Sequence, residues 1–234
     1  MMLDKAVEII DDVAKITDKV ILFHSLSGKD SIALLDLVYP RFKKVTCVYM
    51  YVVKDLRHIN RYLAYANRMY PDVEWIQMPH YSVFSDIRTG YLGRKQNTEQ
   101  RQYTLSDLTD IVRGQTNTEW VCLGFKKSDS LNRRLMLGTY RLNAINDTTK
   151  KFYPLSEYLN KDVLSYITRE GLIQPEKYGP GQSSGCDVGD VNYLVWLRSY
   201  YPDDLERVLR VYPHAERLIF EYDYGRTEKE EKAQ

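Results

Sequence analysis

The sequence predicts an α/β protein whose core is a doubly wound, mainly parallel, five-stranded Rossmann-like sheet, followed by a C-terminal helical extension. Two observations lead to this fold class. Short apolar runs alternate along the chain with segments of helical spacing, a pattern typical of parallel sheets covered by helices. The length of 234 residues is enough for one such core but short for two full domains.

Each element follows from the spacing of its apolar residues. Runs rich in β-branched residues are expected as strands over residues 19–23, 45–53, 73–78 and 119–124. Segments with one apolar face are expected as helices over residues 3–16, 32–38, 55–69, 105–113 and 163–169. Residues 80–103 and 175–190 are expected to be irregular because they are rich in glycine, proline or polar residues, and two or three further helices follow them.

These elements suggest a division of the chain into three parts. We expect residues 1–172 to form the α/β domain. Residues 173–225 are expected to form a loop and a helical extension packed on that domain. The charged residues 226–234 are expected to be a disordered tail.

Composition excludes several functional classes. Lys and Arg total 33 against 32 for Asp and Glu, so the net charge of +1 gives no global attraction to nucleic acid or to a membrane surface. No stretch approaches the roughly 18 apolar residues of a membrane span, and the first residues lack the pattern of a signal peptide. The three cysteines lie far apart without a CxxC pair, so we expect reduced thiols and a cytoplasmic protein. The 20 tyrosines are expected mainly as half-buried packing residues, and a Tyr-rich surface favours a homodimer.

A Ser/Gly segment between the first strand and the next helix is the strongest candidate for chemistry. It reads Ser25-Leu-Ser-Gly-Lys-Asp-Ser31. Backbone amides, the positive end of the helix, three hydroxyls and one ammonium converge there, and such groups bind phosphate or sulfate. The Walker A pattern GxxxxGK(S/T) is absent, so a P-loop NTPase is not indicated.

This segment resembles a known motif. Gly28-Lys29-Asp30-Ser31 matches the end of SGGKDS, the PP-loop sequence of the adenine nucleotide α-hydrolase superfamily and in particular of the phosphoadenosine phosphosulfate (PAPS) reductase family. Leu26 and Ser27 stand where the motif has its first serine and first glycine. The motif hydroxyl is therefore expected from either Ser25 or Ser27.

Three further blocks occur in the order of this family. Gly124 to Arg133 is similar to the family's G-x-R-x-x-E-S-x-x-R, with Lys126 in place of arginine and Asp129 in place of glutamate. Residues 152–167 resemble an architectural segment, and residues 178–186 resemble the loop that closes over the nucleotide. Because doubly wound sheets hold ligands at the carboxyl ends of their strands, Lys126 and Arg133 are expected to bind phosphate.

The resemblance implies a nucleotide site built on the α/β domain and on the loop that follows it. Its nucleotide-binding residues are expected to be Ser25, Ser27, Gly28, Lys29, Asp30, Ser31, Gly124, Lys126, Ser130, Arg133, Gly181 and Ser183. Catalytic roles are expected for Lys29, Ser31, Arg133 and Cys186, and a metal-ligand role for Asp30. The expected cofactors are ATP, or PAPS, together with Mg²⁺. No iron–sulfur cluster is expected, because Val188 and Gly189 stand where members with a cluster have a second cysteine.

The main hypothesis implied by the resemblance is an ATP pyrophosphatase of the PP-loop type. An acceptor oxygen would attack the α-phosphate, pyrophosphate would leave, and a later nucleophile would displace AMP. The first alternative is a PAPS reductase, which would use the thiol of Cys186 or of a partner protein, because the terminal E-C-G-(L/I)-H motif of those enzymes is absent. The second is a catalytically idle nucleotide-binding module, favoured by the altered loop start at Leu26-Ser27. The acceptor stays open and includes nucleic acids.

Overall fold

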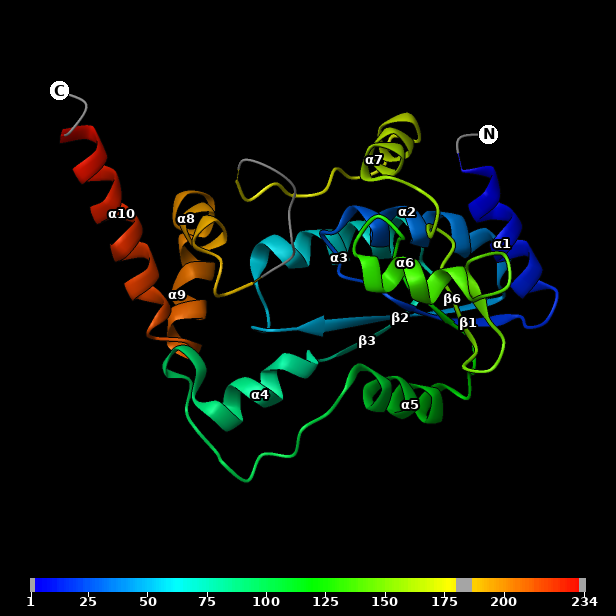
Figure 1. The fold of residues 1–234 in the computed structure, drawn as a ribbon, viewed down its shortest axis with the longest axis horizontal. Coiled ribbons are helices and arrows are strands. Elements are labelled where there is room, and N and C mark those ends of the chain that lie inside the picture. The colour runs from blue at the N-terminus through cyan, green and yellow to red at the C-terminus, as the bar shows by residue number, and fades with distance from the viewer. Residues whose placement is uncertain (1–2, 180–186, 232–234) are drawn as a thin grey trace. The chain divides into compact units, whose positions relative to one another are not determined.

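The computed structural model describes residues 3–179 and 187–231, and Figure 1 shows the course of the chain. Two compact units are present. Unit 1 contains Met1–Met50, Tyr62–Met78 and Ser106–Glu176, and unit 2 contains Tyr51–Arg61, Pro79–Leu105 and Lys177–Gln234. The division predicted from the sequence has boundaries after residues 172 and 225, whereas unit 2 also takes two earlier segments of the chain.

Unit 1 is built on a sheet that has six strands among the described residues, in the order β3-β2-β1-β4-β6-β5. The strands are β1 Lys19–Phe23, β2 Lys44–Tyr51, β3 Glu74–Pro79, β4 Val121–Cys122, β5 Ile145–Asn146 and β6 Lys151–Phe152. β1 pairs in parallel with β2 and β4, β4 pairs in parallel with β6, and β5 is antiparallel to β6. The predicted fold class is confirmed. The strand count exceeds five because the short hairpin of β5 and β6 adds an antiparallel edge strand.

Helices cover both faces of this sheet. Those with residues in unit 1 are α1 Asp4–Ala14, α2 Lys29–Val38, α3 Arg57–Met69, α5 Leu105–Thr116, α6 Leu131–Gly138 and α7 Asn160–Arg169, with the short helix η1 Tyr39–Arg41. α2 packs against α7 on one face, and α5 lies on the other face (Figure 1). Val20, Ile21 and Leu22 of β1 are fully buried. Burial on both faces explains why this strand is a continuous apolar run rather than an alternating one.

Unit 2 is helical in its described part. Its elements are α4 Tyr81–Thr89, η2 Tyr91–Gly93, α8 Val191–Tyr200, α9 Pro202–Val211 and α10 Ala215–Glu231. The prediction of an irregular segment over residues 80–103 is wrong in its first half. The His80 side chain caps α4 by accepting the N–H of Ser82, and Val83 is buried, so a stable helix forms there.

The C-terminal helices are linked by charged side chains. Arg198 of α8 pairs with Asp223 of α10 at 2.7 Å. α10 continues to Glu231, past residue 225, where the prediction placed the start of a tail. In the part of the chain that the structure describes, no helix combines the length and the apolar character needed to cross a membrane.

Candidate functional site

The loop between β1 and α2 is organised by two serines. The backbone N–H of Ser25 donates to Oγ of Ser31 at 3.0 Å, and the two hydroxyl oxygens are also 3.0 Å apart. Leu26 is buried and lies in the left-handed region, with φ of 60°. α2 begins directly after Gly28, whose backbone is extended. The loop therefore folds back onto the first turn of α2.

His24 stabilises the same turn. Its Nδ1 accepts the N–H of Leu26 at 2.9 Å. Burial lowers the pKa of His24 to about 3, so the imidazole is neutral and carries its proton on Nε2. Nε2 is buried and has no hydrogen-bond partner among the described residues, and the imidazole packs against the ring of Trp75 with 5.3 Å between centroids. His24 thus supports the loop backbone and does not act as a cation.

Two glycines allow the chain to pack closely around this loop. A Cβ atom on Gly28 would lie 2.4 Å from Oγ of Ser25. A Cβ atom on Gly124, after β4, would lie 3.2 Å from Cβ of Asp30. The first contact would displace the Ser25 hydroxyl from Ser31, and the second would force Asp30 to shift. Close approach is therefore the reason that both motif positions are glycine.

Five charged side chains join the loops that follow β1 and β4. We call Lys29, Asp30, Lys126, Asp129 and Arg133 the charge cluster. Nζ of Lys126 lies 2.6 Å from Oδ2 of Asp30 and 3.4 Å from Oδ1 of Asp129. Nζ of Lys29 lies 3.2 Å from the same Asp30 oxygen, and Arg133 is 2.7 Å from Oδ2 of Asp129. Three cations against two carboxylates leave one positive charge in excess.

The charge cluster is partly buried and incompletely satisfied. The Lys126 side chain is only 2% exposed. Burial by itself raises the pKa of Asp129, but the N–H of Lys126 and the charges of Lys126 and Arg133 outweigh it, and the pKa is lowered overall. Oδ1 of Asp30 is buried and has no hydrogen-bond partner within the described part of the chain. A buried oxygen without a donor is unusual in a folded protein and is typical of a site that a ligand completes.

Two helix N-termini lie at the same edge of the sheet. Leu22 pairs with Cys122, so β1 and β4 end side by side, and each strand is followed by a loop and a helix, α2 or α6. Ser130 caps α6 by accepting the N–H of Arg133 at 3.2 Å. Helix N-termini carry a partial positive charge and free N–H groups, so together with the cations of the charge cluster they form a site suited to phosphate.

The structure brings together most of the predicted site residues. Those in the two loops and the first turns of their helices are Ser25, Ser27, Gly28, Lys29, Asp30, Ser31, Gly124, Lys126, Ser130 and Arg133. Gly181, Ser183 and Cys186 lie outside the described residues. The metal-ligand role of Asp30 stays a prediction; among described residues no group of three or more His, Cys, Asp or Glu side chains is placed to hold a metal ion.

Asp129 is part of the site but is not among the nucleotide-binding residues predicted from the sequence. It links Lys126 to Arg133 and receives the Lys126 N–H at 2.9 Å. The separation of Asp129 from Lys126 and Arg133 in the sequence could have identified it. Asp129 stands three residues after Lys126 and four before Arg133, and oppositely charged side chains at such separations contact each other along a turn or a helix.

Two solved structures are similar to this chain. The U34-tRNA thiolase NcsA from Methanococcus maripaludis, described with its 4Fe-4S cluster, aligns with a TM-score of 0.50 and 14% identity over 93% of this chain and 78% of that chain. The NH3-dependent NAD synthetase from Campylobacter jejuni, in complex with the nitrate ion, aligns with a TM-score of 0.48 and 13% identity over 93% of this chain and 94% of that chain. No curated protein sequence matches the chain.

The prediction that no iron–sulfur cluster is present is corrected by the likeness to NcsA, because a chain of this fold is described with such a cluster. Clusters are held mainly by cysteine thiolates. Cys47 and Cys122 do not fit this role: both are fully buried on the strands that flank β1, and burial raises the pKa of both thiols. The residues that the structure describes therefore offer no thiolate set for a cluster.

The sequence comparison identifies the family. The model of the phosphoadenosine phosphosulfate reductase domain matches residues 21–191, a range that includes both loops of the site. This match confirms the resemblance that the motifs predicted. The chain belongs to the phosphoadenosine phosphosulfate reductase domain family.

Proposed function

We propose that unit 1 binds ATP and transfers its adenylyl group to an acceptor with release of pyrophosphate. The observation that carries this proposal is the charge cluster between two helix N-termini, with one positive charge in excess and one unsatisfied carboxylate oxygen. A triphosphate supplies several negative oxygens at once, and two adjacent helix N-termini match that extended anion better than a single one.

The reaction needs little from the protein beyond positioning and charge stabilisation. An oxygen of the acceptor attacks the α-phosphorus, and the bond from that phosphorus to the bridging oxygen breaks. Pyrophosphate leaves with the bonding electron pair, and a second nucleophile later displaces AMP from the adenylated acceptor. Lys29 and the first amides of α2 stabilise the leaving pyrophosphate, and Ser31 donates to one of its oxygens. Arg133 contacts the α-phosphate.

Lys126 has a separate part in this proposal. Its ammonium is buried between Asp30 and Asp129, which themselves hold Lys29 and Arg133. Lys126 therefore fixes the two outer cations at a set separation. A preorganised pair of cations stabilises the transition state without reorganising during the reaction.

Binding by variants of the full chain tests the proposal. We expect ATP to bind more tightly than PAPS in calorimetric titrations and the Lys29→Met variant to lose at least tenfold in ATP affinity, because a hydrogen bond to a charged group contributes about 1.5–3 kcal/mol. Lys127→Met is the matched control. Lys127 lies beside Lys126 in the loop that follows β4, but it pairs with Glu157 at 2.6 Å and belongs outside the charge cluster, so this variant should bind within twofold of the parent chain.

The opposite results would assign another function. Tighter binding of PAPS would favour a sulfonucleotide reductase, the activity after which the family is named. Cys47 and Cys122 are too buried to attack a sulfonate, so that reaction would use Cys186 or a partner thiol. Cys186→Ser would abolish reduction in the first case and preserve it in the second, and it would leave ATP binding intact in both. Unchanged ATP affinity in both lysine variants would instead favour an idle module.

A further inference from the structure

One face of α10 is exposed although its centre is aromatic. We call it the α10 face, and it consists of five exposed residues: Glu216, Arg217, Phe220, Glu221 and Tyr224. Phe220 is 68% exposed and Tyr224 is 61% exposed. At 100° per residue the five residues occupy an arc of roughly 140°, opposite the buried Ala215 and Ile219. Aromatic side chains in the middle of such a face, with charges at its margins, are typical of protein interfaces.

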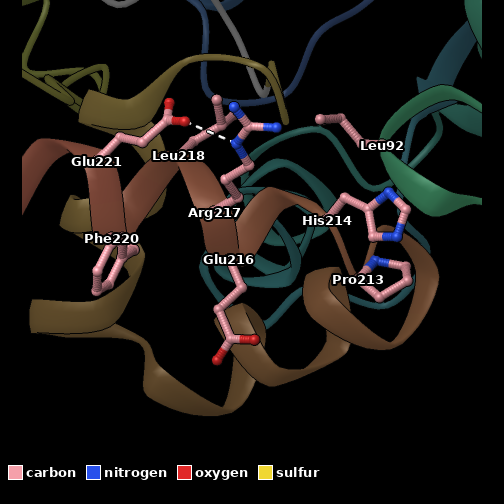
Figure 2. A pocket seen from close by; sticks show the side chains of 8 residues that line it. All are labelled: Leu92, Pro213, His214, Glu216, Arg217, Leu218, Phe220 and Glu221. Carbon is pink, nitrogen blue, oxygen red and sulfur yellow. Dashed lines mark hydrogen bonds and ion pairs between the residues drawn. The ribbon is translucent and has the colours of Figure 1, made fainter.

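A groove lies beside the first turn of α10. It has a volume of about 960 Å³, and Leu92, Pro213 and His214 line it together with residues of the helix (Figure 2). The N–H of His214 donates to the carbonyl oxygen of Leu92 at 3.0 Å, so η2 and the start of α10 form a fixed wall. The groove therefore has the size to receive an aromatic side chain, and Leu92, Pro213, Leu218 and Phe220 provide the apolar part of its lining.

The charges on the α10 face are of both signs. Arg217 and Glu221 pair at 2.7 Å along the helix, as Figure 2 shows, and both remain largely exposed, at 79% and 52%. Glu216 and Glu221 would repel a nucleic acid or an anionic membrane. A second copy of the same helix, running in the opposite direction, would instead present a glutamate to each arginine. The surface is self-complementary.

We propose that the α10 face is a homodimer interface in which two copies of α10 pack antiparallel across a two-fold axis that crosses the exposed face at the level of residue 219 along the helix. Because each residue advances the helix by 1.5 Å, the position of the axis determines which residues of the two copies face each other. Positions equidistant from the axis face each other, so Arg217 meets Glu221 of the second copy, and the two Phe220 rings meet beside the axis. Tyr224 then lies level with His214 of the second copy and enters the groove described above.

The size of this surface predicts the strength of the dimer. Two aromatic side chains that are about two-thirds exposed offer roughly 250 Å² per copy. Stable interfaces bury about 1,200 Å² or more in total. The residues that line the groove, together with Arg217 and Glu221, must therefore provide the rest of the buried area. We therefore expect a dimer at the small end of the range, which dissociates at micromolar concentrations.

Charge reversal in separate chains tests the proposal. In sedimentation velocity of the full chain at 1–100 µM, we expect the wild type to dimerise and the Arg217→Glu and Glu221→Arg variants each to sediment as monomers, since each alone brings like charges together at both ends of the interface. An equimolar mixture of the two variants should recover the dimer mass. In the heterodimer, every reversed charge faces an opposite one.

A matched ion pair on α9 provides the control. Arg210 and Glu206 also stand four residues apart and are 66% and 72% exposed, so Arg210→Glu and Glu206→Arg should leave the dimer intact. Circular dichroism confirms that each variant is folded. A wild type that stays monomeric at 100 µM, a mixture that stays monomeric, or an α9 variant that dissociates would overturn the proposal. ATP affinity should be the same in all of these chains, because none of the changed residues belongs to the charge cluster.

Discussion

Each unit of the molecule contains buried charge, but the two are arranged differently. In unit 2, Asp204 accepts the backbone N–H groups of Arg57 and His58 at 2.8 and 3.0 Å and lies 2.8 Å from Nδ1 of His58. Both the Asp204 and His58 side chains are completely buried. In unit 1, the charge cluster is reached by solvent at its outer members, with Lys29 15% and Arg133 39% exposed.

The difference lies in whether every polar atom has a partner. Both oxygens of Asp204 accept hydrogen bonds, and the rings of Tyr178, Tyr193, Trp196 and Tyr201 pack around His58. Oδ1 of Asp30 accepts none among the described residues. A closed pair can contribute only to stability, whereas an open cluster with spare capacity can bind a ligand. The two regions should therefore respond differently to mutation.

The largest loss of stability is expected when the buried pair of His58 and Asp204 is broken. Asp204→Asn removes the charge that His58 faces and turns one acceptor into a donor beside two backbone N–H groups. Burial lowers the pKa of His58, so the cost is that of buried donors left without an acceptor, about 1–3 kcal/mol each, and we expect a total loss of about 3–5 kcal/mol of unfolding free energy. Chemical denaturation followed by tryptophan fluorescence measures this loss.

The neighbouring residue provides the control for Asp204. Asp203 pairs with Arg57 at 2.7 Å, but its side chain is 64% exposed. Exposed pairs contribute roughly 0–1 kcal/mol, so Asp203→Asn should lower the unfolding free energy by no more than that. Equal losses in the two variants would mean that burial does not distinguish the two carboxylates.

A smaller loss of stability, but a clear loss of binding, is expected from the open cluster. Lys126→Met leaves Asp30 and Asp129 without their shared partner, although Lys29 and Arg133 still compensate each carboxylate in part. We therefore expect about 2–3 kcal/mol of lost unfolding free energy, below the full cost of an uncompensated buried charge. ATP affinity should fall at least tenfold, measured by calorimetry at a temperature where the variant is folded.

Lys126→Arg is the conservative counterpart. The family motif has arginine at this position, so the variant should keep both contacts and retain ATP affinity within a few-fold. Retained affinity in Lys126→Met would contradict the role of Lys126 in fixing the outer cations, even if stability fell as expected.

The sequence was sufficient where the chemistry is local. The strand β1, the turn to α2 and the cations Lys29 and Arg133 follow from short motifs, because a glycine-containing turn before a helix needs only neighbouring residues to form. The family match confirms the resemblance on which these assignments rest, and the binding roles of Lys29 and Arg133 stay predictions. Lys126 was predicted as a phosphate ligand, and its burial between two carboxylates became visible only once β1 and β4 were adjacent.

Other features depend on contacts between distant segments. The pair of His58 and Asp204 joins residues 146 positions apart, and no local pattern indicates it. Gly90 and Gly93 suggest an irregular segment in the sequence, and the prediction therefore lacks α4. In the structure, Gly90 is the left-handed cap at the end of this helix. Oδ1 of Asp30 is buried without a partner among the described residues, on a side chain that Gly124 of a distant loop approaches closely.

The smallest effect concerns pH and compares two histidines. Burial lowers the pKa of His24 to about 3, whereas an unfolded chain has a histidine pKa near 6.5. Between these values the unfolded state binds a proton that the folded state does not, so the unfolding free energy falls as the pH falls below 6.5. At pH 5 this contribution amounts to about 2 kcal/mol. His24→Asn should remove it while its side-chain oxygen still accepts the N–H of Leu26.

His80 provides a comparison for this test, because it follows β3 directly as His24 follows β1. Burial also lowers the pKa of His80, but its side chain is only partly buried and caps α4. His80→Asn should therefore flatten the dependence of unfolding free energy on pH less than His24→Asn does, as measured by urea denaturation at pH 7, 6 and 5. If His24→Asn left the slope unchanged, the pKa of His24 would be the same in the folded and unfolded chains, near 6.5, and below that pH the imidazole would be a further cation at this loop rather than a neutral support for its backbone.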